Sequence, residues 1–261
     1  MQRRSDVSSF LGGVSVGSLG GLIGLGGAEF RLPLLISFYG FVAVQAVILN
    51  KVMSLVVVAS AIPLRGQVVD LSEVWSHNEV IFTLLTGSLV GAWLGADWVT
   101  KLANQTLYRL IAALLVLMAV VLLWSHYFAS GVQFELSFQE RLIFGIMAGF
   151  AIGVVASVMG VAGGELLIPT IMLLFGADII LAGSLAIMVS LPTMLSGLAR
   201  YRRDPRFVVL VEQKRFVIMM LAGSIVGVAL GAWLLTLIPT DYVLLVLAGL
   251  LLLSAYKVYH H

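Results

Sequence analysis

Long apolar runs separated by short polar breaks dominate this chain of 261 residues. The pattern predicts ten hydrophobic segments, and because a helix needs about 20 residues to cross a bilayer, two of them are too short to cross upright. The segments lie at about 10–27, 31–41, 43–63, 80–99 and 107–128, and at about 142–163, 167–177, 179–199, 216–238 and 241–258. The chain is therefore predicted to be an all-α polytopic membrane protein.

Composition supports this fold class and excludes several functions. Hydrophobic residues make up 61% of the chain and charged residues only 11%, too few to cover the surface of a soluble domain. The net charge of +2 argues against nucleic-acid binding, and the absence of cysteine removes thiolate catalysis and cysteine-bound metals. No phosphate-binding loop or HExxH motif occurs. We expect no enzymatic activity, no cofactor and no metal site.

The chain repeats itself at an offset of 136 residues without a gap. GSLVGAWLGA at 87–96 falls on GSIVGVALGA at 223–232, and a glycine-rich stretch at 13–40 falls on 149–176. Matched positions in that stretch are Gly13/Gly149, Gly17/Gly153, Gly24/Gly160, Gly27/Gly163, Glu29/Glu165, Pro33/Pro169 and Gly40/Gly176. Such similarity indicates two copies of one structural unit. The predicted parts are a first transmembrane repeat at 1–128, a connecting loop at 129–141 and a second repeat at 142–261.

The basic residues predict that the two repeats insert in opposite senses. Cytoplasmic loops collect Lys and Arg, and the segment 200–215 carries six of them, whereas its repeat partner 64–79 carries only Arg65. Arg3 and Lys257 place both termini on the cytoplasmic side. Equivalent loops on opposite sides mean inverted topology, which is common in secondary transporters. The short segments then either cross by tilting, giving five crossings per repeat, or fold back as re-entrant hairpins, giving three.

Each repeat contains a stretch that no regular helix can run through. Glycine-rich sequence leads to Pro33 in the first copy and to Pro169 in the second, and we expect helices to start again near these prolines. Paired broken helices in inverted repeats indicate a substrate site near the bilayer midplane. The glycines assigned to this site are Gly26, Gly27, Gly163 and Gly164. The alternative is that these glycines only allow helices to pack closely.

Two glutamates at the breaks are repeat-related, namely Glu29 and Glu165. A charged group inside an apolar segment costs at least about 2.5 kcal/mol, so such residues are functional candidates. Because burial favours the neutral form of a carboxyl group, each glutamate could load and release a proton. The alternative is that each caps free N–H groups at a helix start.

Two cations near the first break have no charged repeat partner. Leu167 stands at the position equivalent to Arg31, and Ile187 at the position equivalent to Lys51. Unmatched positive charge suits one anion in a pseudo-symmetric cavity, whereas the alternative is an ion pair of either cation with Glu29. Asn50 could add hydrogen bonds to a substrate or within the helix bundle.

Small residues also recur every fourth position in two repeat-related helices. The glycines are Gly87, Gly91 and Gly95 in the first repeat and Gly223, Gly227 and Gly231 in the second. Such ridges let helix backbones approach closely, so we interpret them as packing surfaces.

At these residues the chain resembles the sulfite exporter TauE/SafE family, the toluene-sulfonate uptake permeases. The resemblance rests on GxxxGxxxxxxGxxGxExxxP, present from Gly13 to Pro33 and again from Gly149 to Pro169, on the two-half architecture and on length. The family typically shows three consecutive glycines here, and Ala28 departs from that pattern. The resemblance implies a multi-pass carrier in a bacterial or archaeal inner membrane. Its implied substrates are sulfur-containing or organic anions such as sulfite, sulfonates, sulfoacetate or thiosulfate.

We therefore predict a secondary anion transporter with its substrate between the two broken segments, and we favour export in exchange for protons. The predicted substrate contacts are Gly26, Gly27, Glu29, Arg31, Asn50, Lys51, Gly163, Gly164 and Glu165, with Glu29 and Glu165 as proton-coupling candidates. The predicted partners are the anion, the lipid bilayer and, as one option, a second copy in a homodimer. Two alternatives are a cation/proton antiporter that holds its cation between Glu29 and Glu165, and a non-transporting membrane scaffold.

Overall fold

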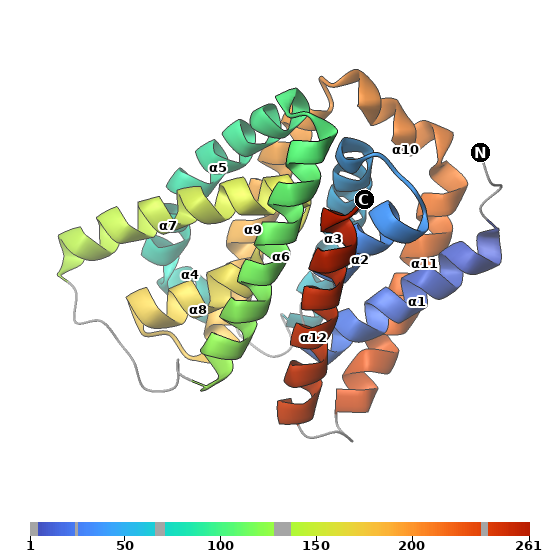
Figure 1. The fold of residues 1–261 in the computed structure, drawn as a ribbon. Coiled ribbons are helices and arrows are strands. Elements are labelled where there is room, and N and C mark those ends of the chain that lie inside the picture. Colours follow the sequence, from blue (N-terminus) through green and yellow to red (C-terminus); the bar gives the residue numbers. More distant parts are fainter. Residues whose placement is uncertain (1–4, 24–25, 66–70, 128–136, 236–239) are drawn as a thin grey trace.

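The computed structural model describes residues 5–23, 26–65, 71–127, 137–235 and 240–261, and within these ranges the chain is built of helices without a strand (Figure 1). The first half contains α1 (Asp6–Ile23), α2 (Ala28–Pro33), the π-helix η1 (Leu34–Phe38), α3 (Ala43–Arg65), α4 (Leu71–Ser76), α5 (Asn78–Lys101) and α6 (Asn104–Tyr127). The second half contains α7 (Phe138–Met159), α8 (Gly164–Phe175), α9 (Ile179–Tyr201), the 3₁₀ helix η2 (Pro205–Val208), α10 (Val209–Glu212), α11 (Lys214–Leu235) and α12 (Thr240–Tyr259). All ten predicted segments are helical, which confirms the all-α class. Residues 128–136, most of the predicted connecting loop, lie outside the described ranges.

The distribution of side chains is that of a membrane protein. Among the described residues, six helices are long and apolar enough to cross a bilayer: α3, α5, α6, α7, α9 and α11. Large apolar side chains such as Phe144 and Leu253 are exposed, whereas Glu29, Arg31 and Lys51 are buried. A water-soluble fold shows the opposite arrangement, because charges prefer water and apolar surface avoids it. The chain is therefore a multi-pass membrane protein.

The helix boundaries follow the sequence repeat. For example, α3 begins at Ala43 and α9 begins at Ile179, 136 residues later. The repeat-related helices α6 and α12 pack side by side and run in opposite directions (Figure 1). The ring of Tyr108, near the start of α6, accordingly lies 5.4 Å from the ring of His261, just beyond the end of α12. Opposite directions for equivalent helices are what inverted repeats require.

The short helices fold back along the helices that precede them. Tyr39, just after η1, donates a hydrogen bond of 2.6 Å from its hydroxyl to the carbonyl oxygen of Ser8 near the start of α1. In the second half, Phe175 at the end of α8 lies beside Gly145 near the start of α7. The 12 residues of α8 span about 18 Å, well short of a hydrocarbon core of about 30 Å. This geometry favours the re-entrant hairpin over the tilted crossing.

The expected restart of the helices at the prolines is wrong. Helix α2 begins at Ala28 and α8 at Gly164, so Pro33 and Pro169 lie inside the helices. The residue before each helix is a glycine in the left-handed conformation, with φ of 71° and 80°. Glycine adopts this conformation at little cost, so the chain completes its turn before it reaches the proline. After Pro33 the helix widens into the π-helical turn η1.

Two glycine-lined helix pairs connect the repeats, α1 with α11 and α5 with α7. A Cβ atom at Gly17 would collide with the backbone carbonyl oxygen of Ser224, and one at Gly153 would collide with that of Ser88. The ridge glycines predicted from sequence all lie in these contacts, namely Gly87, Gly91, Gly95, Gly223, Gly227 and Gly231. Their interpretation as packing surfaces is confirmed.

Candidate functional site

The site forms where the tips of the two re-entrant hairpins meet. Asn50, from α3, is completely buried between them. Its Nδ2 atom donates to the carbonyl oxygen of Ala28 at 2.9 Å and to that of Met159 at 3.0 Å. Asn50 thus ties the start of α2 to the end of α7, while its Oδ1 atom has no hydrogen-bond partner. A single amide therefore joins the two repeats and keeps a free acceptor at the junction.

The two repeat-related glutamates lie against each other at this junction. Glu29 is 1% exposed, and its carboxyl group is close enough to that of Glu165 for one hydrogen bond and a Coulombic interaction. Each carboxyl group interacts with its own backbone N–H at the helix start, but neither oxygen of Glu29 nor Oε2 of Glu165 has a well-formed hydrogen bond. Ionised carboxylates only accept hydrogen bonds, so two of them in contact repel each other. The pair needs a proton or a cation between its oxygens.

Arg31 is a fully buried guanidinium with most of its donors unused. Its Nη2 atom donates to the carbonyl oxygen of Gly26 at 3.3 Å, whereas Nε and Nη1 have no partner. Glu29 acts on it through Coulombic attraction only. In the part of the chain that the structure describes, neither Arg31 nor Lys51 forms an ion pair. The alternative of an ion pair with Glu29 is therefore wrong for both cations.

Lys51 follows Asn50 directly but points elsewhere, because successive residues on a helix diverge by about 100°. Its Nζ atom donates to the carbonyl oxygen of Ala156 at 3.1 Å. A Cβ atom at Gly197 would lie 3.5 Å from Lys51 Nζ and 2.7 Å from Ser157 Oγ. The charge interactions that link Glu29, Glu165 and Arg31 do not include Lys51. Of the four predicted ionisable residues, the structure thus brings three together and places the fourth against α7 and α9.

The four site glycines shape the hairpin tips. Gly26, Gly27 and Gly163 have positive φ angles, whereas Gly164 is the first residue of α8. A Cβ atom at Gly27 would also collide with the backbone of α1. Tight turning and close packing therefore account for these glycines, and their contact with a substrate stays a prediction.

Polar contacts that the sequence did not reveal hold the ends of α5 and α9 together. Arg200 donates from Nε to Oδ1 of Asp97 at 2.8 Å. Arg206 donates to the carbonyl oxygen of Thr100 at 2.7 Å and pairs with Asp204 at 2.8 Å. The guanidinium of Arg206 holds the pKa of the Asp204 carboxyl below its usual range. Sequence showed basic residues in this segment but not the acidic partners, which lie far away along the chain or beside the helix end.

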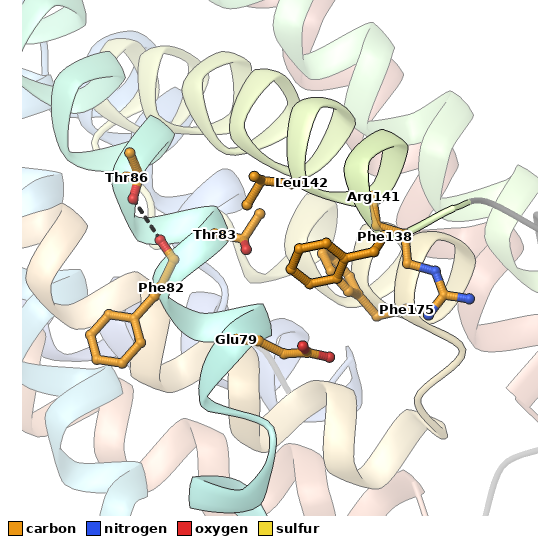
Figure 2. A pocket seen from close by; sticks show the side chains of 8 residues that line it. All are labelled: Glu79, Phe82, Thr83, Thr86, Phe138, Arg141, Leu142 and Phe175. Carbon is orange, nitrogen blue, oxygen red and sulfur yellow. Dashed lines mark hydrogen bonds between the residues drawn. The ribbon is translucent and has the colours of Figure 1, made fainter.

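A pocket of about 430 Å³ lies at the other end of α5. Its lining residues are Glu79, Phe82, Thr83, Thr86, Phe138, Arg141, Leu142 and Phe175 (Figure 2). Glu79 and Arg141 lie on either side of the Phe138 and Phe175 rings in this view. None of the predicted site residues lines the pocket, so it is separate from the junction of the hairpin tips.

Comparison with known proteins identifies the family of this chain. The family model described as "Sulfite exporter TauE/SafE" matches residues 9–258. No curated protein and no solved structure matches the chain. The match includes both hairpins, both glycine-lined helix pairs and every residue of the candidate site. The family consists of membrane exporters of sulfite and related anions, as the resemblance at the glycine-rich breaks implied. The chain belongs to the sulfite exporter TauE/SafE family.

Proposed function

We propose that this protein is a secondary transporter that carries a small sulfur oxyanion or organic sulfonate between the tips of its two hairpins. One observation carries the proposal: Arg31 is completely buried, has no ion-pair partner and keeps Nε and Nη1 unpaired. An unpaired charge costs several kcal/mol to bury, so a guanidinium in this position is best explained by an anion that visits it. Its planar donors match the oxygens of sulfite or a sulfonate.

The surroundings of Arg31 support reversible binding. A partner carboxylate would neutralise the guanidinium permanently, but Glu29 is held in contact with Glu165 instead. At the start of the 12-residue helix α8, Leu166 and Leu167 donate to the carbonyl oxygen of Gly163, and the Glu165 carboxyl group interacts with its own backbone N–H, so the N–H of Gly164 is the candidate donor. Asn50 keeps the two tips together. We propose that substrate contacts come from this set.

Proton coupling would follow from the glutamate pair. When the pair holds one proton, the two carboxyl groups share a hydrogen bond and a single negative charge; when it holds two, the junction is more attractive to an anion. Proton uptake at Glu29 and Glu165 would therefore favour anion binding, and proton release would favour anion departure. We propose that this linkage couples the anion to protons that move in the same direction; the exchange for protons favoured from the sequence would instead require that protonation weakens anion binding.

The glutamate pair also motivates a second candidate, a cation/proton antiporter. Two adjacent carboxyl groups offer several oxygens to a cation, as calcium and sodium sites do. Against this reading, Arg31 lies close enough to attract Glu29 and would repel a cation. No group of three or more potential metal ligands occurs within the described ranges. Calorimetry with calcium or sodium against sulfite separates the candidates: heat from the cation alone would overturn the anion proposal.

The test of transport is sulfite flux in proteoliposomes. The purified protein should move ³⁵S-labelled sulfite, and an imposed pH gradient should accelerate the flux. Protein-free liposomes and Lys257→Met, a charge removal at an exposed position of α12, serve as controls. Flux that is unchanged in both Arg31→Ala and Glu29→Gln would refute the residue assignments. If the wild-type protein carries no flux and both variants fold as well as the wild type, a non-transporting scaffold is supported.

We also propose that the protein lies in the inner membrane with both termini in the cytoplasm. The arginine-rich segment that follows α9 supports this orientation, since cytoplasmic loops collect positive charge. Cysteine is absent from the chain, so single cysteines can be introduced on a clean background. A cysteine at exposed Arg202 should react with a membrane-impermeant maleimide only after the cells are opened.

A further inference from the structure

Lys51 is a second buried cation without a counter-ion, and it lies apart from Arg31. It is 0% exposed and belongs to no ion pair within the described ranges. An ammonium group can donate three hydrogen bonds, and the structure gives Lys51 one, to the carbonyl oxygen of Ala156. Two donors and one positive charge are therefore left unused inside the protein.

Ser157 supplies a further free donor at the same place. Its side chain is completely buried, and its Oγ atom has no hydrogen-bond partner. Tyr201 donates a hydrogen bond of 2.9 Å to the carbonyl oxygen of Ser157 and so holds this residue in position from the end of α9. A buried hydroxyl without a partner costs about 1–3 kcal/mol, so its retention beside an unused ammonium indicates a ligand that accepts hydrogen bonds.

Gly197 lets α9 lie directly against these donors. A methyl group at this position would collide with Ser157 Oγ at 2.7 Å and would lie 3.5 Å from Lys51 Nζ, which means that a side chain here would displace the Ser157 hydroxyl. The repeat-related position is Ala61, so the absence of a side chain is specific to the second repeat. The same holds for the donors themselves, because Gly21 replaces Ser157 and Ile187 replaces Lys51 in the other half.

We infer that the unused donors of Lys51 and Ser157, where Gly197 of α9 lies against them, form a second anion-binding station, which takes a small oxyanion such as sulfite. The station lies on the side of α3 that faces α7 and α9, close to the end of α9 where the arginine-rich segment begins. An anion would pass between this segment and Arg31 through Lys51. The inference rests on the proposed function and adds a separate step to it.

A purely structural role for Lys51 must be separated from this one. The Ala156 carbonyl belongs to the last turn of α7, where a cation is favourable, so Lys51 also stabilises the end of that helix. Gly197→Ala distinguishes the two roles, because its methyl group displaces the Ser157 hydroxyl, whereas the acceptor of Lys51 is the backbone carbonyl of Ala156. Gly145→Ala is the matched control, since its methyl group would lie 2.6 Å from the side chain of Thr83 and so creates a similar clash away from Lys51.

The experiment measures sulfite flux and equilibrium binding of ³⁵S-labelled sulfite to the full-length protein. We expect Gly197→Ala and Lys51→Met to raise KM for sulfite about tenfold, Lys51→Arg to raise it less, and Gly145→Ala to leave it unchanged. In an Arg31→Met background, weak sulfite binding should persist and should disappear when Lys51→Met is added.

Two different failures are distinguishable. If the wild-type protein neither binds nor moves sulfite, the proposed function fails and the station fails with it. If wild-type flux is normal but Gly197→Ala and Lys51→Met keep the wild-type KM, the station is refuted and the proposed function stands. A fall in thermal stability of Lys51→Met with unchanged KM would assign Lys51 to helix capping alone.

Discussion

The glycine-lined helix pairs and the central junction differ in how closely the two repeats match. In the helix pairs, repeat-related residues make equivalent contacts: Gly17 packs against the backbone of α11, and Gly153 packs against the backbone of α5. At the junction, the two glutamates are matched, whereas the position equivalent to Arg31 in the other repeat is Leu167. The packing contacts are therefore alike in the two repeats, whereas the buried cation is found in one repeat only. A symmetric frame with one unmatched cation at the junction would offer a single anion site there rather than two repeat-related sites.

Substitution of Arg31, the buried cation at the junction, gives the largest expected effect. Arg31→Met should lower sulfite flux at least about 30-fold, since removal of a buried charged partner typically costs about 2–5 kcal/mol. Leu167→Met, at the equivalent position of the other repeat, should change flux less than about threefold. Proteoliposome flux, normalised to folded protein by size-exclusion chromatography, measures both. Equal losses in the two variants would show that the junction is functionally symmetric.

Neutralisation of the matched glutamates should give smaller and equal effects. Glu29→Gln and Glu165→Gln should each lower the flux driven by a pH gradient about 10- to 100-fold, in line with about 1.5–3 kcal/mol for a hydrogen bond to a charged group. Exchange of sulfite across the membrane without a gradient should be retained, because Arg31 is intact. A gradient effect that survives in either variant would contradict coupling through a shared proton.

Substitutions in the helix pairs should affect stability rather than transport. Gly17→Ala and Gly153→Ala each place a methyl group against a backbone carbonyl oxygen of the neighbouring helix, and overpacking of this kind costs about 1–3 kcal/mol. Thermal denaturation in detergent should show similar losses for both variants. Gly249→Ala should show no loss, because its methyl group meets open space. A large loss in one variant only would break the symmetry assigned to the packing.

The smallest expected effect concerns Asp204, whose repeat partner is Val68. Its pKa is lowered by Arg206, so the ionised form stabilises the fold above the unfolded-state pKa of about 3.9. That contribution is lost as the pH falls through the lower folded-state pKa. Asp204→Asn should therefore cost at most about 1 kcal/mol at pH 7, a typical value for a partly exposed pair, and progressively less below pH 4. Thermal stability measured across this range checks the sign, and a cost that grows on acidification would contradict it.

The sequence was sufficient to predict the helices and their packing surfaces, because both follow from local or periodic patterns of residues. Apolar runs located all ten segments, and the repeated glycines identified packing surfaces on α5 and α11, although not α7 and α1 as the helices that contact them. The start of α2 could not be predicted correctly, because both Gly27 and Pro33 can mark a helix boundary. The structure shows that the left-handed Gly27 precedes the helix and that Pro33 lies within it. The separation of Lys51 from Arg31 was also hidden, since it depends on how α3 is rotated against α7 and α9. Ser157 had one sequence signal, a mismatch with Gly21 within otherwise similar stretches.

The most direct test is an experimental structure of the protein grown with selenite, an analogue of sulfite, with diffraction recorded at the selenium absorption edge. The account predicts an anomalous peak between residues 26–33 and 160–169, within hydrogen-bond distance of the Arg31 guanidinium, and loss of that peak in Arg31→Met. Selenium bound only at the exposed arginines after α9, with none between the hairpin tips, would contradict it.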